Sequence, residues 1–181
     1  MNERPRVYLA GPDVFLPDAH AAADSMKAAC ADAGLEGVFP LDADMPPTIA
    51  AKSGDRQAAW IYRANVDLIQ GCAGVIANLT PFRGVSADPG TAFEIGFATA
   101  LRLPVTAWSL DRRPYHQRLA SLDPRRVVQA RPGTLVDTLD TTTVENFGHP
   151  DNLMLCVPLV RSRVHDSFAE AAAALARVLL K

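Results

Sequence analysis

Short apolar segments alternate along this sequence with longer segments of helical periodicity. Strands are predicted at Arg6–Ala10 and at residues 38–39, 75–79, 104–108 and within 153–159. Helices are predicted at residues 18–33, 56–70 and 91–101, and from a capping box formed by Ser167 and Glu170. Residues 75–79 are almost wholly apolar, as expected of a strand whose sheet is covered on both faces. The alternation predicts an α/β fold with a doubly wound, mostly parallel sheet of about five strands and helices on both faces.

The length predicts one domain. A chain of 181 residues buries on the order of 70% of the surface that its unfolded form exposes, which is enough for a core without disulfides. We expect residues 1–181 to form this single domain. Residues 109–150 are mixed and rich in turn residues, and we interpret them as an insertion of undetermined shape.

Charge and cysteine content exclude several classes of protein. The net charge is −2, and the basic runs are only pairs, at residues 112–113 and 125–126, so we expect no nucleic-acid partner. No segment approaches the ~20 apolar residues of a membrane span, and the first residues lack the apolar core of a signal peptide. Cys30, Cys72 and Cys156 are far apart and form no ligand cluster. We therefore expect a cytoplasmic protein with reduced thiols, no metal and no cofactor.

The segment 88–96 has the densest chemical signal. Glu94 is predicted in the first turn of a helix, where the helix dipole favours an ionised carboxylate suited to nucleophilic attack. Asp88 precedes this helix in a loop that can turn it toward the same cavity. Thr91 and Glu94 also have the spacing of a capping box, in which Glu94 would only satisfy a backbone N–H. Spacing alone favours the cap.

Other polar residues stand near the same predicted sheet edge. Tyr8 lies at the end of the first strand, where its hydroxyl could hydrogen-bond a carboxylate. Alternatively, Tyr8 is a core residue whose hydroxyl only contacts water. Asn65 and Asp67 could belong to the site, or they could be solvent-facing residues of their helix. Gly11 is followed by proline and an acid, which makes a poor anion-binding turn. Nucleoside monophosphates and dinucleotides are thus disfavoured as ligands, and uncharged nucleosides remain acceptable.

Four segments together resemble the nucleoside 2-deoxyribosyltransferase family. They follow the family's order over most of the chain, whereas residues 109 to about 143 add nothing to the match. The segments are residues 7–12, 75–84, 88–96 and 152–154.

The resemblance implies a flavodoxin-like fold and a catalytic mechanism. Glu94 would attack C1′ of a 2′-deoxynucleoside and form a covalent deoxyribosyl-enzyme, from which a second base takes the sugar with net retention. Tyr8 would orient Glu94, Asp88 would bind the sugar hydroxyls, and Gly11 would contact the substrate. The reaction belongs to nucleotide salvage and requires no cofactor.

The resemblance also implies partners and leaves base recognition open. Asn152 and Met154 match a segment that completes the neighbouring subunit's site, so we expect a homo-oligomer; alternatively, residues 153 and 154 are core residues of a last strand. The family's helix carboxylate falls on Asn65, which cannot act as an acid, and Asp67 lies half a turn away. Asp44 takes the base-contacting position and could supply the acid. Purines are mildly favoured.

Two other functions remain open. The first is a hydrolase on the same scaffold, in which water resolves the covalent intermediate. The second is a non-catalytic nucleoside-binding module in which Glu94 is only a helix cap.

Overall fold

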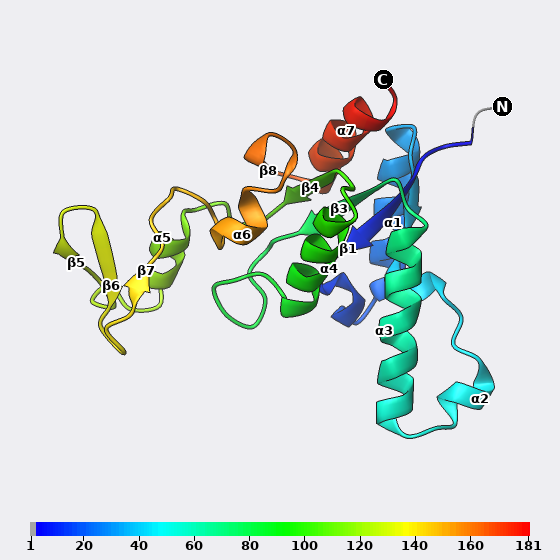
Figure 1. Ribbon diagram of the computed structural model, residues 1–181, viewed down its shortest axis with the longest axis horizontal. Helices are drawn as coiled ribbons and strands as arrows, with labels where there is room; N and C mark the ends of the chain where they lie inside the picture. The colour runs from blue at the N-terminus through cyan, green and yellow to red at the C-terminus, as the bar shows by residue number, and fades with distance from the viewer. Residues whose placement is uncertain (1–2) are drawn as a thin grey trace.

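The computed structural model describes residues 3–181 and is built on a parallel five-stranded sheet (Figure 1). The strands follow the spatial order β2-β1-β3-β4-β8, and each neighbouring pair is parallel. This order is that of flavodoxin-like sheets, so the predicted fold class is confirmed. The strands are β1 (Arg6–Ala10), β2 (Glu36–Val38), β3 (Gly74–Asn78), β4 (Val105–Trp108) and β8 (Val164–His165).

Helices cover both faces of the sheet. One face packs against α1 (Ala19–Asp32) and α7 (Phe168–Leu179), and the other against α3 (Gly54–Gln70) and α4 (Pro89–Ala100). Alternate residues of β1 enter the two cores, because successive side chains of a strand point to opposite faces. Val7 and Leu9 join the core with α1 and α7, whereas Tyr8 joins the core with α3 and α4.

Residues 109–150 contain a second, smaller sheet. It is antiparallel, in the order β5-β6-β7, and stands apart from the main sheet at one end of the molecule (Figure 1). Its elements are α5 (Tyr115–Ala120), β5 (Val127–Arg131), β6 (Thr134–Asp137) and β7 (Thr143–Val144).

The short helical elements lie in the connections. They are η1 (Pro12–Phe15), η2 (Pro40–Asp42), α2 (Pro47–Ala50), α6 (Leu153–Cys156) and η3 (Val160–Ser162). Within residues 3–181, every helix is too short or too polar to span a bilayer.

The strand predicted within residues 153–159 is wrong. That segment forms α6, because Asn152 caps it by accepting a hydrogen bond from the Met154 backbone N–H at 2.9 Å. The last strand is β8, further along the chain. A short apolar run does not distinguish helix from strand by periodicity, and here the cap decides. At α7 the predicted cap is found: Ser167 accepts from Glu170 N at 3.3 Å, although the Glu170 carboxylate reaches Asp166 N rather than completing the box.

A buried ion pair connects the segment of the small sheet to the main domain. Arg118 of α5 lies 3.4 Å from Asp151, and both side chains are 2% exposed. The Asp151 carboxylate also accepts hydrogen bonds from the backbone N–H groups of Ala87 and Asn152, each at 2.8 Å. Asp151 thus fixes together α5, the start of α6 and the loop before α4.

Replacing Asp151 should be strongly destabilising. Asp151→Ala leaves the buried Arg118 charge without a counter-ion and should lower the free energy of unfolding by about 3–5 kcal/mol, as measured by chemical denaturation. Asp123→Ala is the matched control, because it removes an exposed pair with Arg125 and should cost only about 0–1 kcal/mol. Equal losses in the two variants would contradict the structural role of Asp151.

Candidate active site

A cavity of about 400 Å³ lies near the carboxyl ends of β1 and β2 and against α3 and α4. In doubly wound sheets the ligand crevice forms at these ends, where the strand order reverses, and β1 and β3 are the neighbouring strands at that point. The walls come from the loops after β1 and β2 and from the helices α3 and α4. The lining residues are Gly11, Val14, Phe15, Pro40, Leu41, Ala43, Met45, Trp60, Ile61, Asn65, Asp88, Gly90 and Glu94.

Tyr8 and Glu94 form a short hydrogen bond at this cavity. The Tyr8 hydroxyl donates to Glu94 Oε1 at 2.6 Å, and the tyrosine is fully buried. Burial and the adjacent Glu94 charge raise the pKa of Tyr8 far above its ordinary value, so its hydroxyl stays protonated. One carboxylate oxygen of Glu94 is therefore held by a fixed donor, and the other is left for chemistry.

The helix cap of α4 is Asp88, not Glu94. The Asp88 carboxylate accepts hydrogen bonds from Thr91 N at 3.0 Å and from Thr91 Oγ1 at 3.3 Å. Glu94 then falls in the second turn, so both its predicted place in the first turn and the capping-box alternative are wrong. Pro89 at the first helical position favours this start, because proline there loses no helical hydrogen bond.

Glu94 is not held ionised as the sequence suggested. Burial raises its pKa to about 7; the Tyr8 hydrogen bond acts in the opposite direction, and the Asp88 charge adds to the increase. The stabilisation of charge by a helix dipole is confined to the first turn, so it contributes little here. At neutral pH the unliganded site holds Glu94 partly protonated.

Two glycines leave room for the carboxylates. A Cβ on Gly90 would lie 2.8 Å from Asp88 Oδ2, and a Cβ on Gly11 would lie 2.9 Å from Asn78 Cβ. Asn78 in turn donates to Asp13 at 3.0 Å. Side chains at either glycine would push against groups that shape the cavity.

The other predicted site residues are divided between the cavity and the surface. Asn65 lines the cavity, whereas Asp67 is exposed on α3 outside it. Asp44 is exposed, although its neighbours in sequence line the wall. Asn152 caps α6 and Met154 lies on it; neither lines this chain's cavity, and Met154 is 70% exposed.

The apolar walls were missed by sequence reasoning. Trp60 and Ile61 of α3 both line the cavity, and Ile61 is 46% exposed. Phe15 forms another wall and stacks on Phe82 with ring centroids 5.4 Å apart. The Arg83 guanidinium carbon Cζ lies over the Phe82 ring, 4.7 Å from its centroid. Phe15 lies in the connection after the first strand, which a doubly wound sheet places at the ligand crevice, and this position was the available signal.

The polar groups of the cavity suit hydrogen bonding to an organic ligand. Among residues 3–181, no group of three or more histidine, cysteine or acidic side chains is placed to hold a metal ion. The cavity offers two carboxylates, one amide and a mostly apolar wall. This combination suits a neutral ligand that has polar groups at one end and a flat apolar part at the other.

Comparisons with known proteins point to one enzyme family. A sequence model of the nucleoside 2-deoxyribosyltransferase family matches residues 7–154. An uncharacterized protein of Schizosaccharomyces pombe is 37% identical over 118 residues, which are 65% of this chain and 56% of that protein. The match thus spans little more than half of that relative's length.

Solved structures extend the comparison to the fold. A 2-desoxiribosyltransferase from Leishmania mexicana is 32% identical with a TM-score of 0.71, over 96% of this chain and 97% of that chain. A 2-deoxyribosyltransferase from Bacillus psychrosaccharolyticus is 16% identical with a TM-score of 0.57, over 92% and 90% of the two chains. The second likeness shows the fold alone.

Neutralising Glu94 should stabilise the protein above neutral pH. The folded-state pKa of about 7 exceeds the unfolded value of about 4.3, so the folded chain binds more protons between them and loses stability as pH rises through this window. Glu94→Gln should therefore raise the free energy of unfolding by about 1–3 kcal/mol at pH 8 and change it little at pH 4. Denaturant titrations at the two pH values measure this difference.

The exposed Glu36 provides the control. Glu36→Gln removes a surface contact with Arg6 and should change stability by no more than about 1 kcal/mol at either pH. A Glu94→Gln protein that is less stable than the wild type at pH 8 would contradict a burial cost at Glu94.

Proposed function

The chain belongs to the nucleoside 2-deoxyribosyltransferase family, and we propose that it transfers the 2-deoxyribosyl group of 2′-deoxynucleosides from one nucleobase to another. One observation carries the proposal: Glu94 opens on a nucleoside-sized cavity, is oriented by Tyr8 and stands beside Asp88. A cap role for Glu94 would have required no such arrangement, and Asp88 fills that role.

The proposed reaction proceeds through Glu94. Its free carboxylate oxygen forms a bond to C1′ while the bond from C1′ to the base nitrogen breaks, and the bonding electrons leave with the base, which takes up a proton. A second base then attacks C1′ from the vacated side, gives up its ring N–H proton and releases the glutamate carboxylate, so configuration is retained. A 2′-deoxy sugar lacks an electron-withdrawing hydroxyl next to C1′, which eases the positive charge of the transition state.

Burial of Glu94 has a chemical consequence in this reaction. A carboxylate that is poorly solvated stabilises a cationic C1′ more strongly than one surrounded by water. Tyr8 holds one oxygen in place, so little reorganisation accompanies the attack. Asp88 uses Oδ2 for its helix cap, and its other oxygen is available to accept from the sugar hydroxyls.

Base binding is assigned to Asn65 and the apolar walls. The Asn65 amide both donates and accepts hydrogen bonds, so it can pair with a base edge but cannot protonate it. Trp60 and Phe15 offer flat apolar surface on which a base can stack. We favour purines, and we place Asp44 at the rim as the candidate acid. Asp67 is directed away from this cavity and has no part in the proposal.

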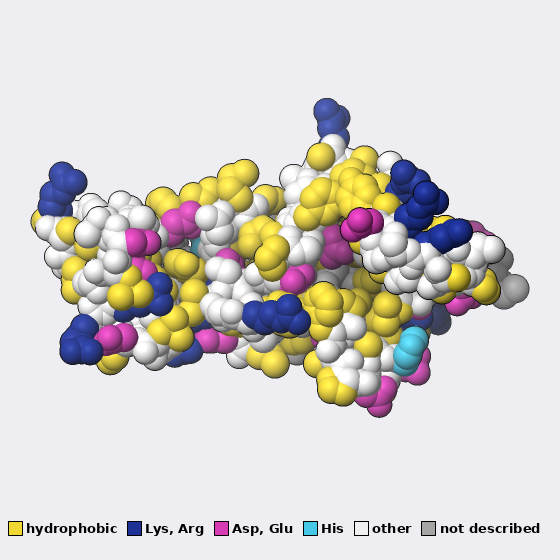
Figure 2. All heavy atoms as spheres, turned by 90° about the horizontal axis from the view of Figure 1, so that it is seen from below, with side chains coloured by type: hydrophobic (Ala, Val, Ile, Leu, Met, Phe, Trp, Pro, Cys, Tyr) yellow, Lys and Arg dark blue, Asp and Glu magenta, His cyan; other side chains and the backbone are white. Residues whose placement is uncertain are grey.

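We also propose that two copies of the chain complete each site. Met154 is an exposed apolar side chain outside its own chain's cavity, and Asn152 fixes the helix that carries it. Tyr62 and Phe93 are also exposed and pack together, with ring centroids 5.8 Å apart. The space-filling view shows hydrophobic side chains gathered in groups on one face (Figure 2). Apolar groups of this kind are typical of subunit interfaces.

The reaction fits a salvage role in a reducing compartment. It redistributes deoxyribose among existing bases without consuming a cofactor. All three cysteines are buried and free, and burial raises the pKa of each thiol. Free thiols of this kind fit the cytoplasm, where we place the protein.

A base-exchange assay tests the reaction. Incubation with deoxyinosine and adenine should form deoxyadenosine, and Glu94→Gln should lower the rate by about a thousandfold or more while staying folded. With deoxyinosine alone, mass spectrometry should find a deoxyribosyl adduct on the peptide that contains Glu94. Glu36→Gln should retain wild-type turnover. Release of free deoxyribose without deoxyadenosine would instead assign a hydrolase, and full activity of Glu94→Gln would refute the nucleophile.

Mixing two inactive variants tests the shared site. We expect Met154→Arg and Glu94→Gln each to lose activity as purified proteins. In mixed dimers one site would combine an intact Glu94 with the partner's intact Met154, so refolding an equal mixture should recover up to about a quarter of wild-type activity. A mixture of Glu94→Gln with Glu94→Ala is the control and should recover none. Full activity of Met154→Arg alone would contradict the shared site.

A further inference from the structure

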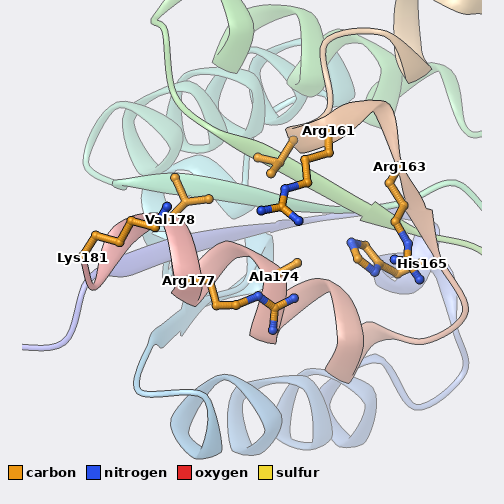
Figure 3. A pocket seen from close by; sticks show the side chains of 8 residues that line it. Arg161, Arg163, His165, Ala174, Arg177, Val178 and Lys181 are labelled. Carbon is orange, nitrogen blue, oxygen red and sulfur yellow. The ribbon is translucent and has the colours of Figure 1, made fainter.

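A second cavity lies at the β8 edge of the main sheet and is surrounded by cations. Its volume is about 190 Å³. Arg161 and Arg163 reach it from the segment before β8, and Arg177 and Lys181 reach it from the end of α7 (Figure 3). Val160, His165, Ala174 and Val178 complete the lining. The cavity shares no lining residue with the candidate active site.

These cations have no acidic partner in the structure. Arginines elsewhere in the second half of the chain, such as Arg112, Arg118 and Arg126, each pair with an aspartate. Within residues 3–181, by contrast, no carboxylate lies within ion-pair distance of the four basic side chains around this cavity. All four are exposed, and together they make the potential of the cavity positive and favourable for an anion.

Helix electrostatics explains only part of the cluster. Cations in the last turn of a helix interact favourably with its carbonyl end, which accounts for Arg177. It does not account for Arg161 and Arg163, which belong to another element. Arg161 and Ser162 have φ values of 58° and 48°, in the left-handed region that residues other than glycine seldom adopt. Such strain persists where surrounding contacts fix it, and it is common at ligand sites.

The local contacts hold this strained turn in place. Ser162 N donates to Leu159 O at 2.7 Å, and Ser162 Oγ donates to Val157 O at 3.0 Å. Burial lowers the pKa of His165, as does the positive charge of Arg163 and Arg177, while Glu170 opposes them. A neutral His165 beside the cavity offers a hydrogen bond without adding to the positive charge.

We propose that this cavity binds the polyphosphate group of a small molecule. Guanidinium groups match phosphate oxygens in geometry and form charge-assisted hydrogen bonds with them. One phosphate monoester carries a charge of only about −2 at neutral pH, so the four cations fit a di- or triphosphate better than a single phosphate. An acidic peptide would supply separated single charges and fits a cavity of this size less well.

The position of the cavity separates its ligand from the nucleoside cavity. β8 is the edge strand, separated by β4 from β3 and by both from β1. Only a short segment joins Arg161 to α6, the helix that carries Met154. A ligand that fixes Arg161 therefore acts on the chain next to α6, and it leaves the nucleoside cavity open.

Calorimetric titration of the full chain tests the proposal. Tripolyphosphate and pyrophosphate should bind saturably with one site per chain, each at least tenfold more tightly than orthophosphate. Arg161→Gln with Arg177→Gln should weaken tripolyphosphate binding by tenfold or more. Arg56→Gln with Arg131→Gln, two exposed arginines distant from the cavity, should leave it unchanged. Saturation with a nucleoside should not displace tripolyphosphate, because the two cavities are separate.

The ligand's source and the alternatives are distinguished in the same assay. Tighter binding of ATP or dATP than of tripolyphosphate would identify a nucleotide, and equal binding would identify the inorganic chain; either supports the proposal. Equal weakening in both double variants would reveal nonspecific attraction and overturn it. Binding of an oligoglutamate peptide without binding of tripolyphosphate would overturn it in favour of a protein partner.

Discussion

The double-sided burial of β1 is the constraint on which the site depends. Val7 and Leu9 fill the core with α1 and α7, so Tyr8 must point to the opposite core, where α4 lies. Its ring packs there as an apolar group, while its hydroxyl reaches Glu94. A shift of the strand by one residue would turn Tyr8 away from Glu94. The hydrophobic pattern that fixes the fold therefore also fixes the orientation of the candidate nucleophile.

This arrangement makes ionisation of Glu94 less favourable. Burial raises its pKa to about 7, and the Tyr8 hydrogen bond offsets only part of that effect. The helix dipole offers little compensation in the second turn, and the negatively charged Asp88 adds to the cost. A purely structural residue at this position would be apolar or neutral. An acid at such a position is typical of a catalytic site, where reactivity is gained at the expense of stability.

The sequence predicted the main sheet because buried strands and covering helices impose strong periodicities. It failed where two local signals compete. Asp88 and Thr91 can both cap a helix, and Pro89 at the first helical position was the signal that decides for Asp88. The apolar residues 153–159 are compatible with a strand or a helix, and the cap at Asn152 favours the helix. The cavity walls and the small antiparallel sheet depend on contacts between distant segments, which periodicity does not contain.

Helical geometry also limits how the leaving base can be protonated. Ile61 and Asn65 are four residues apart on α3, so both face the cavity, and Asp67, two residues further on, faces away. No rotation of its side chain brings Asp67 to the place of Asn65 without unwinding the helix. We infer that an acid for the departing base comes from the loop after η2, where Ala43 and Met45 already line the cavity on either side of Asp44. On this proposal a small movement of the loop, rather than of α3, would bring Asp44 to the departing base.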